Sequence, residues 1–140
     1  MKLKKKFKIL TVVIMFVFLI AAVLAGGLLF TAGERREARN LPIGTVDFSQ
    51  LKDGTYVGEY AGGMYKWRAN KIQVTISSGK VMSIKLLEQA EKRPPEFTEE
   101  LFGRVIQSQS LQVDAVSGAT LTSKAYLKGL ENALDKAKIK

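Results

Sequence analysis

One uncharged run of 22 residues near the N-terminus, residues 9–30, constrains this chain more than any other feature of its sequence. As an α-helix the run would be about 33 Å long, which matches the hydrocarbon thickness of a bilayer. We therefore predict a transmembrane anchor at residues 9–30. A cleaved signal peptide is the alternative, because Ala22–Ala25 resembles a small-residue cleavage site. However, the apolar core of a signal peptide has only about 7 to 15 residues.

Positive charge lies mainly on the N-terminal side of this run. Residues 1–8 contain five lysines and no acidic residue, whereas the segment that follows the run mixes arginine with glutamate. By the positive-inside rule this asymmetry predicts a cytoplasmic N-terminus and an extracytoplasmic location for residues 31–140. The expected location is thus the cell membrane, with a single pass. Cleavage at the alternative site would export the same residues.

The net charge of +9 suggests nucleic-acid binding, but the distribution of the charge argues against it. Residues 31–140 carry 17 basic and 13 acidic side chains, so no strongly basic domain remains and we expect no nucleic-acid partner. The chain also has no cysteine and no histidine. Thiolate metal sites, cysteine nucleophiles and histidine bases are therefore excluded, and we predict no catalytic residue and no metal site. Chemistry would have to use hydroxyls, carboxylates or a bound cofactor.

Glycines, prolines and hydrophobic periodicity divide the rest of the chain. We predict a basic cytoplasmic N-terminus at 1–8, a polar stem at 31–46 and one folded domain at 47–140. The pattern of the domain is typical of an α+β fold, a small antiparallel sheet packed with two helices. In chain order we expect a capped helical turn at 47–51, strands at 55–60, 71–77, 81–87 and 111–114, and a helix at 97–106. A final helix should run to Ala137, with Thr122 or Ser123 as its N-cap.

The segments on either side of Ser78-Gly79 give the clearest hairpin signal in the chain. Both alternate apolar and polar residues, which places three apolar side chains of each strand on one face. We expect these side chains to share one core with the helix that follows: Ile72, Val74, Ile76, Met82, Ile84 and Leu86, against Leu101, Phe102 and Val105.

The segment 114–123, Asp-Ala-Val-Ser-Gly-Ala-Thr-Leu-Thr-Ser, is the most informative one for function. It places small and hydroxyl residues between a predicted strand and a predicted helix. A glycine there allows backbone N–H groups to converge, and the start of a helix adds partial positive charge, so the segment suits a phosphate group. Ordinary helix capping by serine or threonine is the simpler alternative, and residue chemistry alone leaves both open.

The pattern Asp-x-x-Ser-Gly-Ala-Thr-x-Thr-Ser resembles the flavinylation motif of the FMN-binding domain family, and the resemblance extends over residues 47–137. That family includes the covalently flavinylated subunits of sodium-pumping NADH:quinone reductase and of the Rnf complex, and many small exported flavoproteins. In it, a flavin transferase moves FMN from FAD onto the threonine that closes Ser-Gly-Ala-Thr, forming a phosphoester. The resemblance therefore implies covalent FMN on Thr120.

The resemblance also implies roles for the neighbours of Thr120. Asp114 matches the acidic position of the motif, for which we consider two roles: recognition by the transferase, and capping of the turn through an Asx hydrogen bond. The implied cofactor-binding residues are Ser117, Gly118 and Ala119 around the phosphate, with Thr122 and Ser123 where the helix begins.

Residues between 65 and 71 are weaker candidates. Tyr65 and Trp67 have rings that can stack on a flavin, although packing against the sheet is the commoner use of such residues. Lys66, Arg68 and Lys71 have the charge to stabilise a reduced flavin or its phosphate, but a run of this kind is more often a solvated face.

From the resemblance we expect a membrane-anchored, extracytoplasmic flavoprotein that relays electrons from a membrane-bound donor to an extracytoplasmic acceptor or partner reductase. The chain is too short to contain an NADH site or a substrate domain, so we expect a carrier or subunit rather than a self-sufficient enzyme. The alternative, from a different class, is a non-redox or sensory envelope module that binds FMN or another phosphate ligand reversibly.

Overall fold

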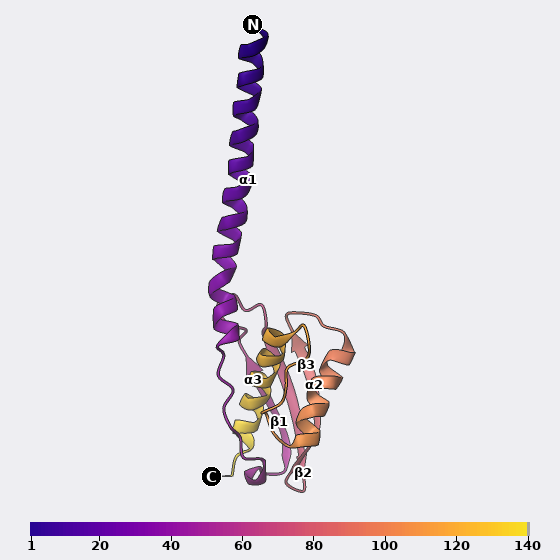
Figure 1. Cartoon of the computed structure of the whole chain (residues 1–140). Helices are drawn as coiled ribbons and strands as arrows, with labels where there is room; N and C mark the ends of the chain where they lie inside the picture. Colours follow the sequence, from indigo (N-terminus) through magenta and orange to yellow (C-terminus); the bar gives the residue numbers. More distant parts are fainter. Residues whose placement is uncertain (140) are drawn as a thin grey trace. The chain divides into compact units, whose positions relative to one another are not determined.

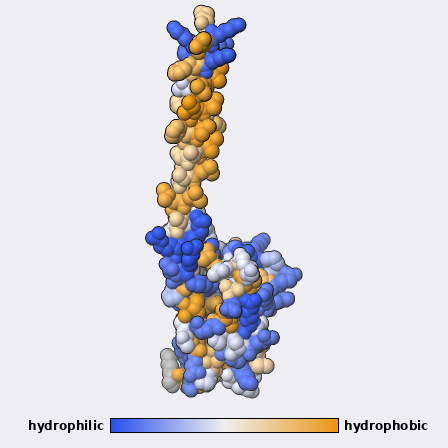
Figure 2. Space-filling view, in the orientation of Figure 1, coloured by the Kyte–Doolittle hydropathy of each residue, from blue (hydrophilic) through white to orange (hydrophobic). Residues whose placement is uncertain are grey.

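A computed structural model describes residues 1–139, and the chain divides in it into two units, Met1–Arg35 and a second unit that starts at Arg36. Helix α1 runs from Lys2 to Arg39 and makes up nearly all of the first unit. The most apolar window of α1 is exposed along its whole length, and the helix is long and apolar enough to cross a membrane. Figure 2 shows this apolar surface, with hydrophilic side chains at the N-terminal end of α1.

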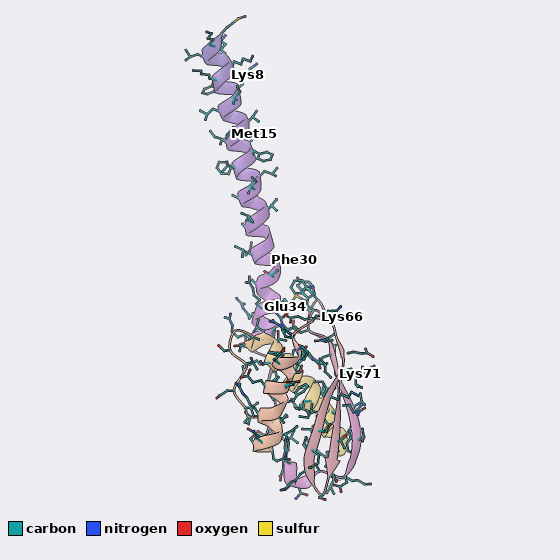
Figure 3. The ribbon with its side chains drawn as sticks, turned by 90° about the vertical axis from the view of Figure 1, so that its right-hand side faces the viewer. Lys8, Met15, Phe30, Glu34, Lys66 and Lys71 are labelled. Atoms are coloured by element: carbon teal, nitrogen blue, oxygen red, sulfur yellow. The ribbon has the colours of Figure 1, made fainter. Side chains whose placement is uncertain are left out.

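The second unit is a three-stranded antiparallel sheet in the order β1-β2-β3, with helices α2 and α3 on one of its faces (Figures 1 and 3). This arrangement confirms the predicted α+β class. A single 3-10 turn, η1 (Phe48–Gln50), precedes the sheet, and the Asp47 carboxylate caps it by accepting a hydrogen bond from the Ser49 N–H. The remaining bounds are Gly54–Tyr60 for β1, Asn70–Ser77 for β2, Lys80–Gln89 for β3, Pro95–Ser108 for α2 and Thr120–Ala137 for α3.

The core lies between the central strand β2 and the two helices. Ile72, Val74 and Ile76 point toward the helices as predicted, and none is more than 2% exposed. Helix α3 also packs closely on β1, because Gly58 has no side chain: a Cβ at that position would lie 2.1 Å from the backbone nitrogen of Ala133. The absence of a side chain at this crossing lets the C-terminal half of α3 lie directly against β1.

Strand β3 departs from the predicted alternation at one end. Val81 pairs with Ile76 and Ser83 pairs with Thr75, so Met82 is an extra residue in the ladder. Such a bulge reverses the facing of the side chains beyond it. Val81 is therefore buried and Met82 is 58% exposed, and the prediction that Met82 belongs to the core is wrong. Two other predicted β3 residues, Ile84 and Leu86, do pack against the core.

Helix α2 is confirmed, with the predicted Leu101, Phe102 and Val105 on its buried face. The strand predicted at 111–114 is wrong, because this segment has no regular structure. The Arg104 side chain explains the difference: its Nη1 donates hydrogen bonds to the carbonyls of Asp114 and Ala115, at 2.8 and 3.1 Å. These carbonyls bond to a helix side chain instead of a neighbouring strand.

Residues 40–46, which we call the strap, lie along the exposed side of α3. Lys124 Nζ donates to the carbonyl of Arg39 just before the strap, at 2.5 Å, and Lys128 Nζ donates to the carbonyl of Pro42, at 3.2 Å. The Gly44 N–H donates to Glu131 Oε2 at 3.1 Å. The segment predicted as a polar stem is thus helical as far as Arg39, and it is bound to α3 at Arg39, Pro42 and Gly44.

Candidate functional site

The motif forms a tight turn that leads directly into α3. The Ala119 N–H donates to the carbonyl of Val116 at 3.0 Å, and Gly118, inside the turn, has a φ of 77° that favours glycine. The buried Ser123 hydroxyl donates to the Ala119 carbonyl at 2.8 Å and accepts from the Val116 N–H at 3.1 Å. Ser123 therefore joins both ends of the turn to the first turn of the helix.

Helix α3 begins at Thr120, with Ala119 as its N-cap residue and no side-chain capping bond. The prediction that Thr122 or Ser123 caps this helix is therefore wrong. The reason is that the turn at 116–119 already directs the chain into the helix, so both hydroxyl residues fall inside its first turn.

Several backbone donors at this helix start remain without an acceptor. The first N–H groups of any α-helix lack an intrahelical acceptor. Within residues 1–139, the N–H groups of Ser117 and Gly118 have none either. Free N–H groups and the positive end of the helix dipole together favour an anion such as a phosphate. The residues present thus fit the phosphate of a flavin nucleotide.

The two threonines of the motif have different environments. Thr120, the first helical residue, is exposed. Thr122 is 2% exposed, and its hydroxyl donates to Glu91 Oε2 at 2.9 Å and accepts from Arg93 Nη2 at 3.1 Å. The Thr122 hydroxyl is thus enclosed, whereas the Thr120 hydroxyl is open to an incoming group.

The structure shows a polar cluster beside the start of α3 that the sequence analysis did not predict. Arg93 and Glu91 form an ion pair at 2.6 Å, and Arg68 Nε lies 3.9 Å from the same carboxylate. The Tyr126 hydroxyl donates to Gln89 Oε1 at 2.8 Å, and burial, assisted by the Glu91 carboxylate, raises the pKa of Tyr126. No sequence signal links Glu91 or Arg93 to the motif, because the hairpin strand and α3 meet only in the folded unit.

Asp114 lines a groove and does not lie in a turn. Within residues 1–139 its carboxylate makes no hydrogen bond, so the Asx cap considered for it is not formed. The groove, which we call the strap groove, has a volume of about 670 Å³. It lies between strap residues Asn40–Ile43 and the segment Leu111–Ala115, with Lys124 and Leu127 contributed by α3.

The aromatic pair predicted as a weaker candidate lies in the loop between β1 and β2. The rings of Tyr65 and Trp67 pack on each other with centroids 4.8 Å apart, and Trp67 is 43% exposed. Neither residue is in a strand, so packing within the sheet does not account for them.

Of the basic residues nearby, Lys71 is paired within the sheet. Figure 3 shows Lys66 on the loop and Lys71 on the strand that follows. Lys71 is paired with Glu88 and Glu59, at 3.0 and 3.3 Å, and hydrogen bonds to these two carboxylates raise its pKa. The Lys71 charge is thus already matched by strand neighbours.

The folded unit resembles proteins of one family. A family model described as "FMN-binding domain" matches residues 66–135, half of the chain, and this match includes the whole motif. No curated protein matches. Among solved structures, the CPE2226 protein from Clostridium perfringens is 26% identical, with a TM-score of 0.47, over 62% of this chain and 88% of that chain. On the strength of the family model, this chain belongs to the FMN-binding domain family.

Proposed function

We propose that this protein is a membrane-anchored, extracytoplasmic carrier of electrons that holds FMN through a phosphoester to the Thr120 hydroxyl. The observation that carries the proposal is the contrast within the motif. Thr120 exposes its hydroxyl at a helix start with unused N–H donors, whereas the hydroxyls of Thr122 and Ser123 are buried and bonded. Membership of the FMN-binding domain family supports FMN as the group.

The attachment requires a flavin transferase as partner and FAD as donor. The pyrophosphate bond of FAD breaks, AMP leaves, and a bond forms between the FMN phosphorus and Thr120 Oγ, which gives up its proton. The chain contributes position: the N–H groups of Ser117 and Gly118 and the start of α3 stabilise the phosphate charge. The Asp114 carboxylate is exposed and makes no hydrogen bond within residues 1–139, and we assign it to recognition by the transferase.

FMN supplies the redox chemistry, and the chain supplies its location and surroundings. The lysines at 1–8 orient the proposed membrane helix with the folded unit outside the cytoplasm. A covalent bond prevents loss of the cofactor by dilution outside the cell. The electron donor would be a membrane-bound reductase, and the acceptor would be an extracytoplasmic protein.

The experiment is intact-mass measurement after co-expression with a flavin transferase. Wild type should gain the mass of FMN less one water, and Thr120→Val should lose this adduct completely while remaining folded. Ser117→Ala is the matched control, because Ser117 is the other exposed hydroxyl of the motif, and it should retain the adduct. An adduct on Thr120→Val, or its loss only in Ser117→Ala, would contradict the proposal.

Acid denaturation separates the proposal from reversible binding by a non-redox module. Flavin that stays with the denatured polypeptide supports the covalent carrier. Flavin that is released completely indicates that the same N–H groups hold the phosphate without a bond.

A further inference from the structure

We propose that the strap groove is the seat of the isoalloxazine ring, and that Lys124 is the residue that faces the reduced ring. This inference rests on the proposed attachment of FMN to Thr120. It assigns the strap, which lies outside the family match, to the cofactor site.

Helical spacing places the groove next to the attachment residue. Lys124 follows Thr120 by four residues, so the two side chains lie on the same side of α3, about 6 Å apart along the helix axis. Leu127, one turn further, also lines the groove. A group attached to Thr120 therefore starts one helical turn from the groove, and the ribityl chain provides the reach to enter it.

The groove has the chemistry that a flavin ring requires. Its volume of about 670 Å³ is within the range of small-molecule sites. Leu41, Ile43 and Val113 line it and are only half-buried, which leaves apolar surface for the dimethylbenzene edge of the ring. Gln112, beside them, offers an amide for the pyrimidine edge.

Lys124 makes this groove favour the reduced state of the flavin. Among the groove residues that the structure describes, Lys124 is the one cation, and its Nζ is held by the Arg39 carbonyl at 2.5 Å. Uptake of two electrons and one proton converts the oxidised ring to an anion with one negative charge. A nearby ammonium group stabilises this anion, so Lys124 should raise the midpoint potential of the flavin.

The Tyr65–Trp67 pair is the competing seat. Its two rings are already in contact with each other, so a flavin could not insert between them. The strap groove, in contrast, offers contact from the strap, the motif segment and α3 together.

Flavin fluorescence of the full chain, loaded by the transferase, distinguishes the two seats. Val113→Trp puts an indole in the groove and should quench the fluorescence several-fold. Met82→Trp is the matched control, because Met82 is exposed on β3 near the β2–β3 turn, and it should leave the fluorescence unchanged. Trp67→Phe should also leave it unchanged. A rise in fluorescence in Trp67→Phe, with no quenching in Val113→Trp, would overturn the proposal.

A pair of lysine variants tests the role of Lys124. If Val113→Trp does not fold, this pair also decides whether the ring lies in the strap groove. Lys124→Gln and Lys128→Gln each remove one bond between α3 and the strap region, but only Lys124 lines the groove. In a dithionite titration, Lys124→Gln should shift the midpoint potential to a more negative value, and Lys128→Gln should not. Equal potentials in the two variants would overturn the proposal.

Adduct mass, measured first on every sample, keeps this inference separate from the proposed attachment. If wild type carries no adduct, the attachment proposal fails. The same tryptophan variants with added free FMN then report whether the ring occupies the groove. Quenching in Val113→Trp would support the seat, and its absence would overturn it.

Discussion

The folded unit contains the dipeptide Ser-Gly in two turns, and the two turns treat their N–H groups differently. At Ser78-Gly79, between β2 and β3, both N–H groups donate to the Asp53 carboxylate, at 2.9 and 2.8 Å. At Ser117-Gly118, before α3, neither N–H group has an acceptor within residues 1–139. The glycine φ values are nearly equal, 75° and 77°.

Both turns have N–H groups that need an acceptor. Converging N–H groups attract a negative charge, and the hairpin turn obtains it from its own chain. The motif turn has the N–H groups of Ser117 and Gly118 and the added positive end of α3, but no carboxylate among residues 1–139 bonds to it. In our proposal the FMN phosphate takes the place there that the Asp53 carboxylate takes in the hairpin.

The largest expected effect on stability comes from removing the internal anion. Asp53→Ala leaves the Ser78 and Gly79 N–H groups to water and should lower the free energy of unfolding by about 1–2 kcal/mol. Urea denaturation measures this loss, and the amount of FMN adduct should not change. An unchanged stability would show that the carboxylate does not matter to the hairpin turn, and the comparison would lose its basis.

The two glycines allow a matched test of the positive φ that both turns require at glycine. An alanine Cβ would meet nothing within 4 Å at either Gly79 or Gly118, so only the positive φ opposes it. Gly79→Ala and Gly118→Ala should each cost about 1 kcal/mol of stability. Only Gly118→Ala should also reduce adduct formation, because it disturbs the donors around the phosphate. If Gly118→Ala carries the full amount of FMN adduct, flavin attachment does not depend on the conformation of this turn.

The smallest loss of stability is expected from a substitution inside α3. Thr122→Val keeps the shape of the side chain but removes the hydroxyl that bonds to Glu91 and Arg93. The free energy of unfolding should fall by about 0.5–1 kcal/mol, and the adduct should remain. Thermal unfolding and intact mass of the same sample measure both quantities. Loss of the adduct with unchanged stability would show that Thr122, not Thr120, carries the flavin.

Much of the sheet and helix pattern could be predicted because local periodicity reports burial. Ile72, Val74 and Ile76 alternate along a central strand, and the structure buries all three. Met82 could not be predicted in the same way, since a bulge depends on how two strands pair and not on the sequence of one. The failed strand at 111–114 has a similar cause, because Arg104, on another element, bonds to its carbonyls.

The candidate site was located by residue type, but its internal arrangement was not. Small and hydroxyl residues before a helix identified the segment that contains Thr120. Which hydroxyl is exposed depends on where the helix begins, and that is decided by the turn and by Ser123. Residues that contact the motif from elsewhere, such as Glu91 and the strap, carry no signal that links them to it.

The attachment of the strap to α3 also limits how far the cofactor can travel. Lys124 binds the Arg39 carbonyl, so only the nine residues Thr31–Arg39 lie between the end of the uncharged run and the first bond to α3. Even fully extended, they reach about 30 Å. In the proposed topology this short connection keeps the flavin close to the bilayer surface. Such a carrier meets its electron donor by lateral diffusion, and it cannot serve as a freely diffusing shuttle.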